Sequence, residues 1–284
     1  MANLIKKYIN YNNKKQVLKL VFLCYNTNGS DVCMKALITG ATSGIGLDMA
    51  RYLATMKCEL ILVARNKEKL ELIQEKLPTK VTIIVADLSN EQKAKELYVV
   101  AKKENIDILI NNAGFGDFGY LTDTDLNKDL DQINTNVKAV HILTKSFVKD
   151  MEKKDTDTYI LNVASSAAFQ PGPLMSTYYA TKSYVYQLSE ALYYEEKKKK
   201  TNVHVSVLCP GPVDTNFNNV AGVHFAVKPL KSTYVAKYAI DQMFKNKMLI
   251  IPGTTMKMAK FFSRFVSDKF MLRQIYKIQR KKAD

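Results

Sequence analysis

Residues 39–46 read Thr39-Gly40-Ala41-Thr42-Ser43-Gly44-Ile45-Gly46, and they stand between a short apolar run and the start of a helical pattern. We expect Gly40 to make a tight turn, Gly44 to let the backbone approach a pyrophosphate, and Gly46 to allow close packing of helix on strand. The helix N-terminus would then offer N–H groups to phosphate, with Thr42, Ser43 and Ile45 in the same turn. The alternative is an ordinary glycine-rich turn between a strand and a helix.

Outward from this turn, apolar runs alternate with helical patterns. The predicted strands are Ala36–Thr39, Glu59–Val63, Val81–Ala86, Ile106–Ile110, Tyr159–Val163, Val203–Leu208 and Met248–Ile251. The helical patterns cover residues 45–56, 67–76, 90–103, 125–152, 178–198 and 232–246. Such alternation is typical of βαβ units, and short apolar runs fit strands covered on both faces. The sequence therefore predicts an α/β fold, a Rossmann-type doubly wound sheet of seven parallel strands, formed by residues 34–253.

The two ends of the chain carry most of its net charge of +15. Residues 1–33 contribute +4 and residues 254–284 contribute +7, which leaves +4 for the residues between. This distribution argues against a nucleic-acid groove in the central domain. The four cysteines form no CxxC pair and the three histidines are isolated, so we expect no disulfide framework, no metal site and a cytoplasmic location.

Residues 1–33 are rich in Asn and Lys near their start, which predicts an extension with little order. Its apolar run, Val21–Tyr25, is far shorter than the roughly 20 residues of a membrane span. Since Met34 opens directly onto the first strand, one hypothesis makes Met34 the natural start and the extension non-native. A version beginning at Met34 should then keep its activity.

The tail from Thr254 shows helical periodicity in two segments that break near Ser267-Asp268. Its apolar positions are Met258, Phe261, Phe262 and Phe265, then Met271, Leu272, Ile275, Tyr276 and Ile278, with basic residues between them. Either these amphipathic helices lie on an anionic membrane surface as a peripheral contact, or their apolar faces pack on the domain or on a subunit partner.

Arg65 follows the second predicted strand, where dinucleotide-binding folds place an acid for a ribose hydroxyl or an arginine for a 2′-phosphate. No acid stands there, so NADP(H) is favoured over NAD(H). Asp87 and Leu88 follow the third strand, where Asp87 could hydrogen-bond an adenine or cap a turn.

Tyr178 and Lys182 lie four residues apart in a helical pattern, and so on one face. A free tyrosine is a poor base at neutral pH, and a neighbouring ammonium would lower its pKa toward a useful range. Without other motifs, the two would be surface neighbours.

Together with the glycine turn, several further motifs resemble the short-chain dehydrogenase/reductase family over residues 34 to about 252. They are Asn111-Asn112-Ala113-Gly114, Asn136, Ser165, Tyr178-x-x-x-Lys182 and Pro210-Gly211. The resemblance implies that Tyr178 exchanges a proton with the substrate oxygen, that Ser165 hydrogen-bonds that oxygen, and that Asn136 extends a proton relay from Lys182. Ser166 and Asn134 are the nearby competitors for the last two roles.

The resemblance also implies further cofactor contacts. They come from Asn112, Ala113, Gly114, Tyr178, Lys182, Pro210, Gly211, Val213 and Thr215. The implied reaction is hydride transfer between NADP(H) and a carbonyl or alcohol carbon. The alternative is a catalytically silent NADP-binding regulatory or scaffold protein of the same fold.

On the substrate side, the resemblance places a mobile loop at residues 216–231 and a pocket lining at residues 167–173. Their apolar content favours a small hydrophobic molecule, such as a steroid-like, long-chain or aromatic ketone or alcohol. Members of the family also often form homodimers or homotetramers.

Overall fold

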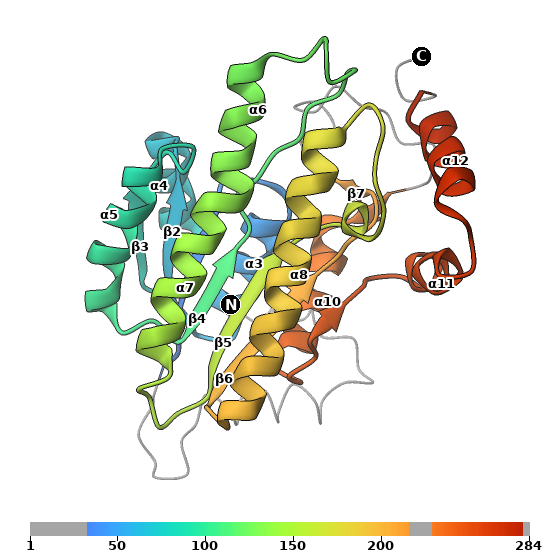
Figure 1. Cartoon of the computed structure of the whole chain (residues 1–284). Coiled ribbons are helices and arrows are strands. Elements are labelled where there is room, and N and C mark those ends of the chain that lie inside the picture. The colour runs from blue at the N-terminus through green and yellow to red at the C-terminus, as the bar shows by residue number, and fades with distance from the viewer. Residues whose placement is uncertain (1–32, 216–228, 281–284) are drawn as a thin grey trace.

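The centre of the protein is a sheet of seven parallel strands (Figure 1). A computed structural model describes residues 33–215 and 229–280 of the chain. Along the sheet the strands are β3 (Val81–Val85), β2 (Glu59–Ala64), β1 (Lys35–Thr39), β4 (Ile108–Asn111), β5 (Thr158–Val163), β6 (Val203–Leu208) and β9 (Leu249–Ile250). The prediction of a doubly wound seven-stranded sheet is confirmed, with strand ends that differ by no more than two residues.

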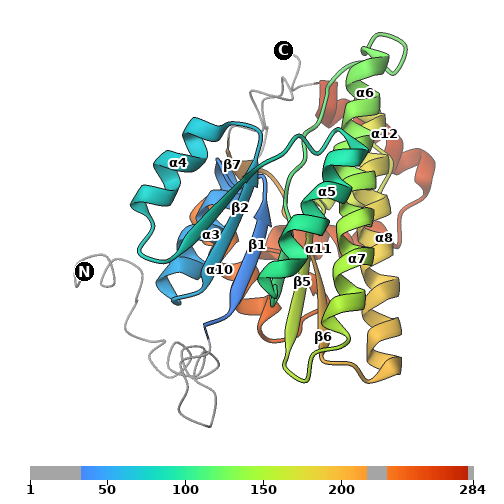
Figure 2. The same ribbon diagram turned by 90° about the vertical axis from the view of Figure 1, so that its left-hand side faces the viewer.

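Helices cover both faces of this sheet, as Figure 2 shows. The helices are α3 (Gly44–Thr55), α4 (Lys67–Lys76), α5 (Glu91–Ala101), α7 (Val140–Met151), α8 (Ser176–Lys199) and α10 (Ser232–Met243). Ala36 and Ile38 of β1 pack in the core on the side of α3 and α10, while Leu37 between them packs on the side of α5 and α7. Side chains alternate across a strand, so a fully apolar run is required where both faces are covered.

The helical pattern predicted for residues 125–152 contains a local change of winding. Helix α6 (Leu126–Ile133) passes through a π-helical segment, η3 (Asn134–Ala139), before α7 begins. A π-turn inside a helix is rare and occurs often at functional sites. Here it contains Asn136.

The tail forms the two predicted segments, α11 (Thr254–Ser263) and α12 (Asp268–Arg280). A pair of two-residue strands, β7 (Val213–Asp214) and β8 (Leu230–Lys231), was not predicted because each is too short to show a period. No helix within the described ranges has both the length and the apolar character needed to span a membrane. The N-terminal extension up to residue 32 and the loop residues 216–228 lie outside the described part of the chain.

Candidate active site

The glycine turn follows β1, where the order of the strands in the sheet reverses. From β1 the chain continues to β2 and β3 on one side and to β4, β5 and β6 on the other. Ligands in open α/β sheets bind at the carboxyl ends of the strands at such a point. Gly40 has a φ of +66°, which glycine adopts without strain. The side-chain amide of Asn112, just after β4, donates to the backbone oxygens of Thr39 (3.0 Å) and Gly40 (3.1 Å).

Thr39 was not among the predicted site residues, although it ties the two strands together. Its hydroxyl accepts the backbone N–H groups of Asn112 and Ala113, each at 3.0 Å. Asn112 therefore supports the turn with both its backbone and its side chain.

The other two glycines of the turn are held by close neighbours. Gly44 has a φ of +54°, and a Cβ there would lie 3.0 Å from the methyl group of Thr215. A Cβ on Gly46 would collide with the side chain of Asn112 and approach the oxygen of Gly40 to 2.5 Å. The atoms that leave no room for a side chain at Gly46 thus belong to Gly40 and Asn112. We had expected the helix to pack on a strand there.

The other residues of the glycine turn, Thr42, Ser43 and Ile45, remain accessible to solvent. Ser43 is exposed and extended, and its side chain forms no capping hydrogen bond to α3. Thr42 and Ile45 are half-buried.

Two candidate nucleotide contacts lie at the carboxyl ends of β2 and β3. Arg65 is exposed and forms no ion pair with another described residue. The Asp87 carboxylate accepts hydrogen bonds from the backbone N–H of Ser89 at 3.0 Å and from the Ser89 hydroxyl at 2.9 Å. These are the bonds expected of an aspartate that caps a turn. Leu88 beside it is buried.

Tyr178 and Ser165 meet where the end of β5 faces the first turns of α8. The Ser165 hydroxyl donates a hydrogen bond to the phenol, which favours the phenolate form. The same oxygen accepts the backbone N–H of Ala167 at 3.1 Å. Ser166 instead gives its backbone N–H to Pro210 at 2.8 Å. The geometry therefore brings Ser165, and not its neighbour, to Tyr178.

Lys182 lies on the same face of α8, with its Nζ 5.8 Å from the centre of the Tyr178 ring. The ammonium donates to the backbone oxygen of Val163 at 2.9 Å and is only 5% exposed. Burial lowers the pKa of Lys182 to about 8. Burial also raises the pKa of Tyr178, and the hydrogen bond from Ser165 opposes this rise. The net direction is opposite to the one predicted for a tyrosine beside an ammonium, because desolvation of the phenolate dominates.

Asn136 is fully buried in the π-helical segment and joins three parts of the site. Its amide group donates to the oxygen of Phe115 (2.9 Å) and to the hydroxyl of Thr181 (3.1 Å), and its oxygen accepts the N–H of Phe115 at 3.1 Å. A Cβ on Gly114 would lie 2.8 Å from the Asn136 oxygen and 3.3 Å from the Lys182 ammonium. Asn136 and Lys182 therefore converge at Gly114, while the competitor Asn134 is half-buried.

The segment after β6 faces both the glycine turn and the tail. Val213 pairs with Leu230 in the small sheet. Two residues further on, the Thr215 side chain lies beside Gly44. A Cβ on Gly211 would lie 2.7 Å from the side chain of Met256 in α11. Pro210 is buried, as is Cys209 before it. Burial raises the pKa of the Cys209 thiol to about 12, so it stays protonated at neutral pH.

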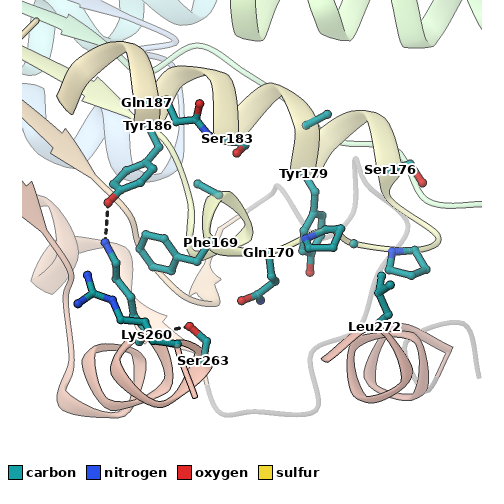
Figure 3. A pocket seen from close by; sticks show the side chains of 16 residues that line it. Phe169, Gln170, Ser176, Tyr179, Ser183, Tyr186, Gln187, Lys260, Ser263 and Leu272 are labelled. Carbon is teal, nitrogen blue, oxygen red and sulfur yellow. Dashed lines mark hydrogen bonds between the residues drawn. The ribbon is translucent and has the colours of Figure 1, made fainter. Parts of the chain in front are cut away.

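A cavity of about 730 Å³ lies beside this centre, between α8 and the tail (Figure 3). It is lined by Ala168, Phe169, Gln170, Pro171, Gly172, Pro173, Ser176, Tyr179, Ala180, Ser183, Tyr186, Gln187, Lys260, Ser263, Arg264 and Leu272. The predicted lining segment is therefore in place from residue 168 on. Tyr179 contributes to the wall and Tyr178 does not, so this cavity lies beside the Tyr178 position and is not lined by it.

Each of the two histidines in the described ranges pairs with another group. His141 shares a hydrogen bond with Tyr184, and His204 with Asp157, each at 2.7 Å. Within residues 33–215 and 229–280, no three His, Cys, Asp or Glu side chains gather as metal ligands would.

Comparisons with known proteins agree with this geometry. The sequence model of the family described as short chain dehydrogenase matches residues 34–223. The chain therefore belongs to the short chain dehydrogenase family, and the resemblance predicted from the motifs is confirmed. The chicken (Gallus gallus) protein named hydroxysteroid dehydrogenase-like protein 1 is 36% identical over 192 residues. The match covers 63% of this chain and 56% of the chicken protein, so the chain spans little more than half of that relative.

Two solved structures share the fold. A short-chain dehydrogenase from Sphingobium yanoikuyae in complex with NADPH superposes with a TM-score of 0.73 at 26% identity, covering 78% of this chain and 88% of that one. A short chain dehydrogenase/reductase from Burkholderia phymatum in complex with NAD gives a TM-score of 0.74 at 24% identity, covering 81% and 92%. At this identity the second likeness bears on the fold alone.

Proposed function

We propose that the protein is an NADP(H)-dependent oxidoreductase that interconverts a carbonyl and an alcohol, with Tyr178 as general acid and base. The observation that carries the proposal is the convergence of Ser165, Tyr178, Lys182 and Asn136 on one buried site. The four side chains come from three places in the chain, with Asn136 in η3, Ser165 just after β5, and Tyr178 and Lys182 on α8. Ligands of such folds bind at the carboxyl ends of the strands.

The residues around the glycine turn fit a dinucleotide. Glycine stands at two positions where a side chain would reduce the space for the nucleotide. A Cβ at Gly44 would press on Thr215, and a Cβ at Gly114 would lie between Asn136 and Lys182. The residues that would hold the nucleotide are Gly40, Thr42, Ser43, Gly44, Ile45, Gly46, Arg65, Asp87, Leu88, Asn112, Ala113, Gly114, Tyr178, Lys182, Pro210, Gly211, Val213 and Thr215. When bound, the nicotinamide supplies or accepts the hydride.

The protein's own part of the reaction is to hold the oxygen and to move a proton. In the reducing direction, the Tyr178 hydroxyl gives its proton to the substrate oxygen, and in the oxidising direction it takes that proton back. Ser165 holds the oxygen through a hydrogen bond, as it now holds the phenol. The Lys182 ammonium, 5.8 Å from the ring, stabilises the phenolate that forms when the proton leaves.

Arg65 supports a preference for NADP(H), because it is exposed at the carboxyl end of β2 and forms no ion pair with a carboxylate of the described residues. One structure that shares the fold was obtained with NADPH and another with NAD, so the fold accommodates both nucleotides. We expect Arg65→Ser to raise the KM for NADPH about tenfold and to leave the KM for NADH nearly unchanged. Equal shifts for both nucleotides would contradict the assignment.

The substrate in this proposal is a hydrophobic ketone or alcohol, and the active form is a homodimer or homotetramer. The chicken relative is named hydroxysteroid dehydrogenase-like protein 1, and a steroid alcohol or ketone is a compound of this kind. The apolar residues Phe169, Tyr186 and Leu272 around the neighbouring cavity support it as well.

The test is a panel of steroid, long-chain and aromatic ketones with their alcohols, followed by the absorbance of NADPH and of NADH. The proposal predicts turnover of at least one hydrophobic class, faster with NADPH. If the protein binds NADPH tightly but turns over no member of the panel in either direction, the silent regulatory alternative replaces the enzyme.

A further inference from the structure

The outer face of α11 is an uncovered row of large apolar side chains. Met258, Phe261 and Phe262 of α11 and Phe265 in the turn that follows it are each 55–74% exposed, and we call these four residues the apolar stripe. The Phe261 ring contacts the rings of Phe262 and Phe265, at centre distances of 5.4 Å and 5.5 Å. Single exposed apolar residues are ordinary on a protein surface, whereas a continuous row of aromatic ones marks an interaction site.

The opposite face of α11 is already in use. Met256 packs where a Cβ on Gly211 would stand, and Lys260 donates to the Tyr186 hydroxyl at 2.6 Å (Figure 3). The Lys260 ammonium also lies 4.4 Å from the centre of the Phe169 ring. Because these contacts fix the inner face against the domain, the exposed apolar stripe lies on the other side of α11, which is at the periphery of the ribbon in Figure 1.

Helix α12 does not cover the stripe in the described part of the chain, since the four side chains are each 55–74% exposed. Helix α12 directs its own buried residues, Ile275 and Gln279, toward the domain, where Gln279 donates to the Tyr179 hydroxyl at 2.6 Å. Tyr276 shares a hydrogen bond of 2.7 Å with Tyr120. Both tail helices are therefore docked through one face, and the stripe belongs to neither contact.

Charge indicates what covers the stripe. Residues 254–284 hold nine Lys or Arg against two Asp. Of the ion pairs between described residues, none involves α11 or α12. Lys257 and Arg264 border the stripe and are exposed, although Lys257 also donates to the Tyr238 hydroxyl at 3.1 Å and Arg264 also lines the cavity. The tail presents further exposed cations on α12, at Lys269, Arg273 and Lys277. A second copy of the chain would bring the same positive charge to the contact, whereas an anionic lipid surface complements it.

We propose that the apolar stripe of α11 docks the protein onto a membrane surface that contains anionic lipids. The phenylalanines enter the boundary between headgroups and acyl chains, and the flanking cations face the headgroups. Since the inner face of α11 lines the cavity beside Tyr179, docking brings that cavity to the lipid surface. The proposal does not depend on the proposed reaction.

The test is co-sedimentation of the full-length protein with vesicles of phosphatidylcholine alone and of equal parts phosphatidylcholine and phosphatidylserine. We expect binding to the phosphatidylserine vesicles that weakens as salt is raised. The triple variant Phe261→Ser, Phe262→Ser, Phe265→Ser keeps the net charge and should lose about tenfold or more of this binding. The matched control Leu72→Ser, Val99→Ser, Val100→Ser changes side chains on α4 and α5 that are 51–54% exposed, and it should bind like the wild type.

Circular dichroism and thermal melting of both variants show whether they remain folded. Wild-type protein that stays in the supernatant with phosphatidylserine vesicles at low salt would overturn the proposal. So would a folded triple variant that binds as well as the wild type. A change of mass for the triple variant in light scattering without vesicles would assign the stripe to a contact between copies instead.

Discussion

The inner face of α8 and the outer face of α11 both follow from residues at helical spacing, but the side chains of the first are buried and those of the second are exposed. On α8, Tyr178 and Lys182 are at most 9% exposed and bond to Ser165 and Val163. On α11, the residues of the apolar stripe are more than half exposed, and the ring contacts of Phe261 are with its own neighbours. A helical period identifies the side chains that share a face, and the partner of that face has to come from elsewhere in the fold.

The difference teaches where function resides in each region. In the proposed active site at α8, the protein's own side chains complete the contacts, so the loss of a single hydroxyl should change the chemistry. At α11 the described chain leaves a face incomplete, so changes there should alter association and leave the chemistry intact. The predictions below test this contrast.

The largest effect is expected from Ser165→Ala. Removing the hydroxyl takes away the donor to Tyr178 and to the substrate oxygen, so turnover should fall about a hundredfold to a thousandfold. Ser166→Ala is the matched control, since Ser166 reaches Pro210 only through its backbone N–H. Steady-state rates with a substrate from the panel provide the measurement, and equal losses in the two variants would contradict the assignment of Ser165.

A smaller effect concerns the pH dependence of stability. Burial lowers the pKa of Lys182 from 10.5 to about 8, so the unfolded chain binds more protons than the folded protein between these values. The free energy of unfolding contributed by this group therefore rises with pH across that window. Relative to Lys182→Met, the wild type should gain about 2 kcal/mol between about pH 7.5 and about pH 9.5.

Urea unfolding of both proteins at the two pH values gives this difference directly. The titrations of Tyr178 and Cys209 occur in both proteins and largely cancel in the comparison. A difference that stays constant, or that falls as the pH rises, would show that Lys182 is not buried as described.

The smallest effect is expected in the tail, at Gln279. Its amide group donates to Tyr179, but its buried oxygen has no partner among the described residues. Gln279→Met removes both the bond and the unpaired oxygen, so the free energy of unfolding should change by no more than about 1 kcal/mol. Chemical denaturation measures it, and a loss of several kcal/mol would mean that the tail is fixed to the domain as firmly as the active site is.

Most of the fold could be predicted because each strand is an apolar run and each helix has its own period. The seven parallel strands and the two tail helices follow directly from these signals. The π-helical segment could not be predicted, because it keeps the apolar pattern of the helix around it and differs only in winding. The strands β7 and β8 were missed because two residues show no period.

The site could be predicted only as far as its motifs reach. Ser165 and Asn136 were preferred over Ser166 and Asn134 because they resemble the family's positions, and the contacts of the structure favour the same two residues. Thr39 and Thr181 were missed because a buried threonine that holds a backbone carries no sequence signal. The direction of the Tyr178 pKa was wrong because spacing along a helix reveals a neighbouring charge but not the depth of burial.

The central claim is that Tyr178 carries the proton, and two adjacent tyrosines of α8 allow a direct test. Tyr178→Phe and Tyr179→Phe remove one hydroxyl each from adjacent positions, of which Tyr178 is buried and Tyr179 is half-buried. Turnover and NADPH affinity of both variants should be measured with one substrate from the panel. We predict that Tyr178→Phe loses about a thousandfold or more in turnover while it still binds NADPH, and that Tyr179→Phe stays within about tenfold of the wild type. Substantial turnover by Tyr178→Phe would contradict the account.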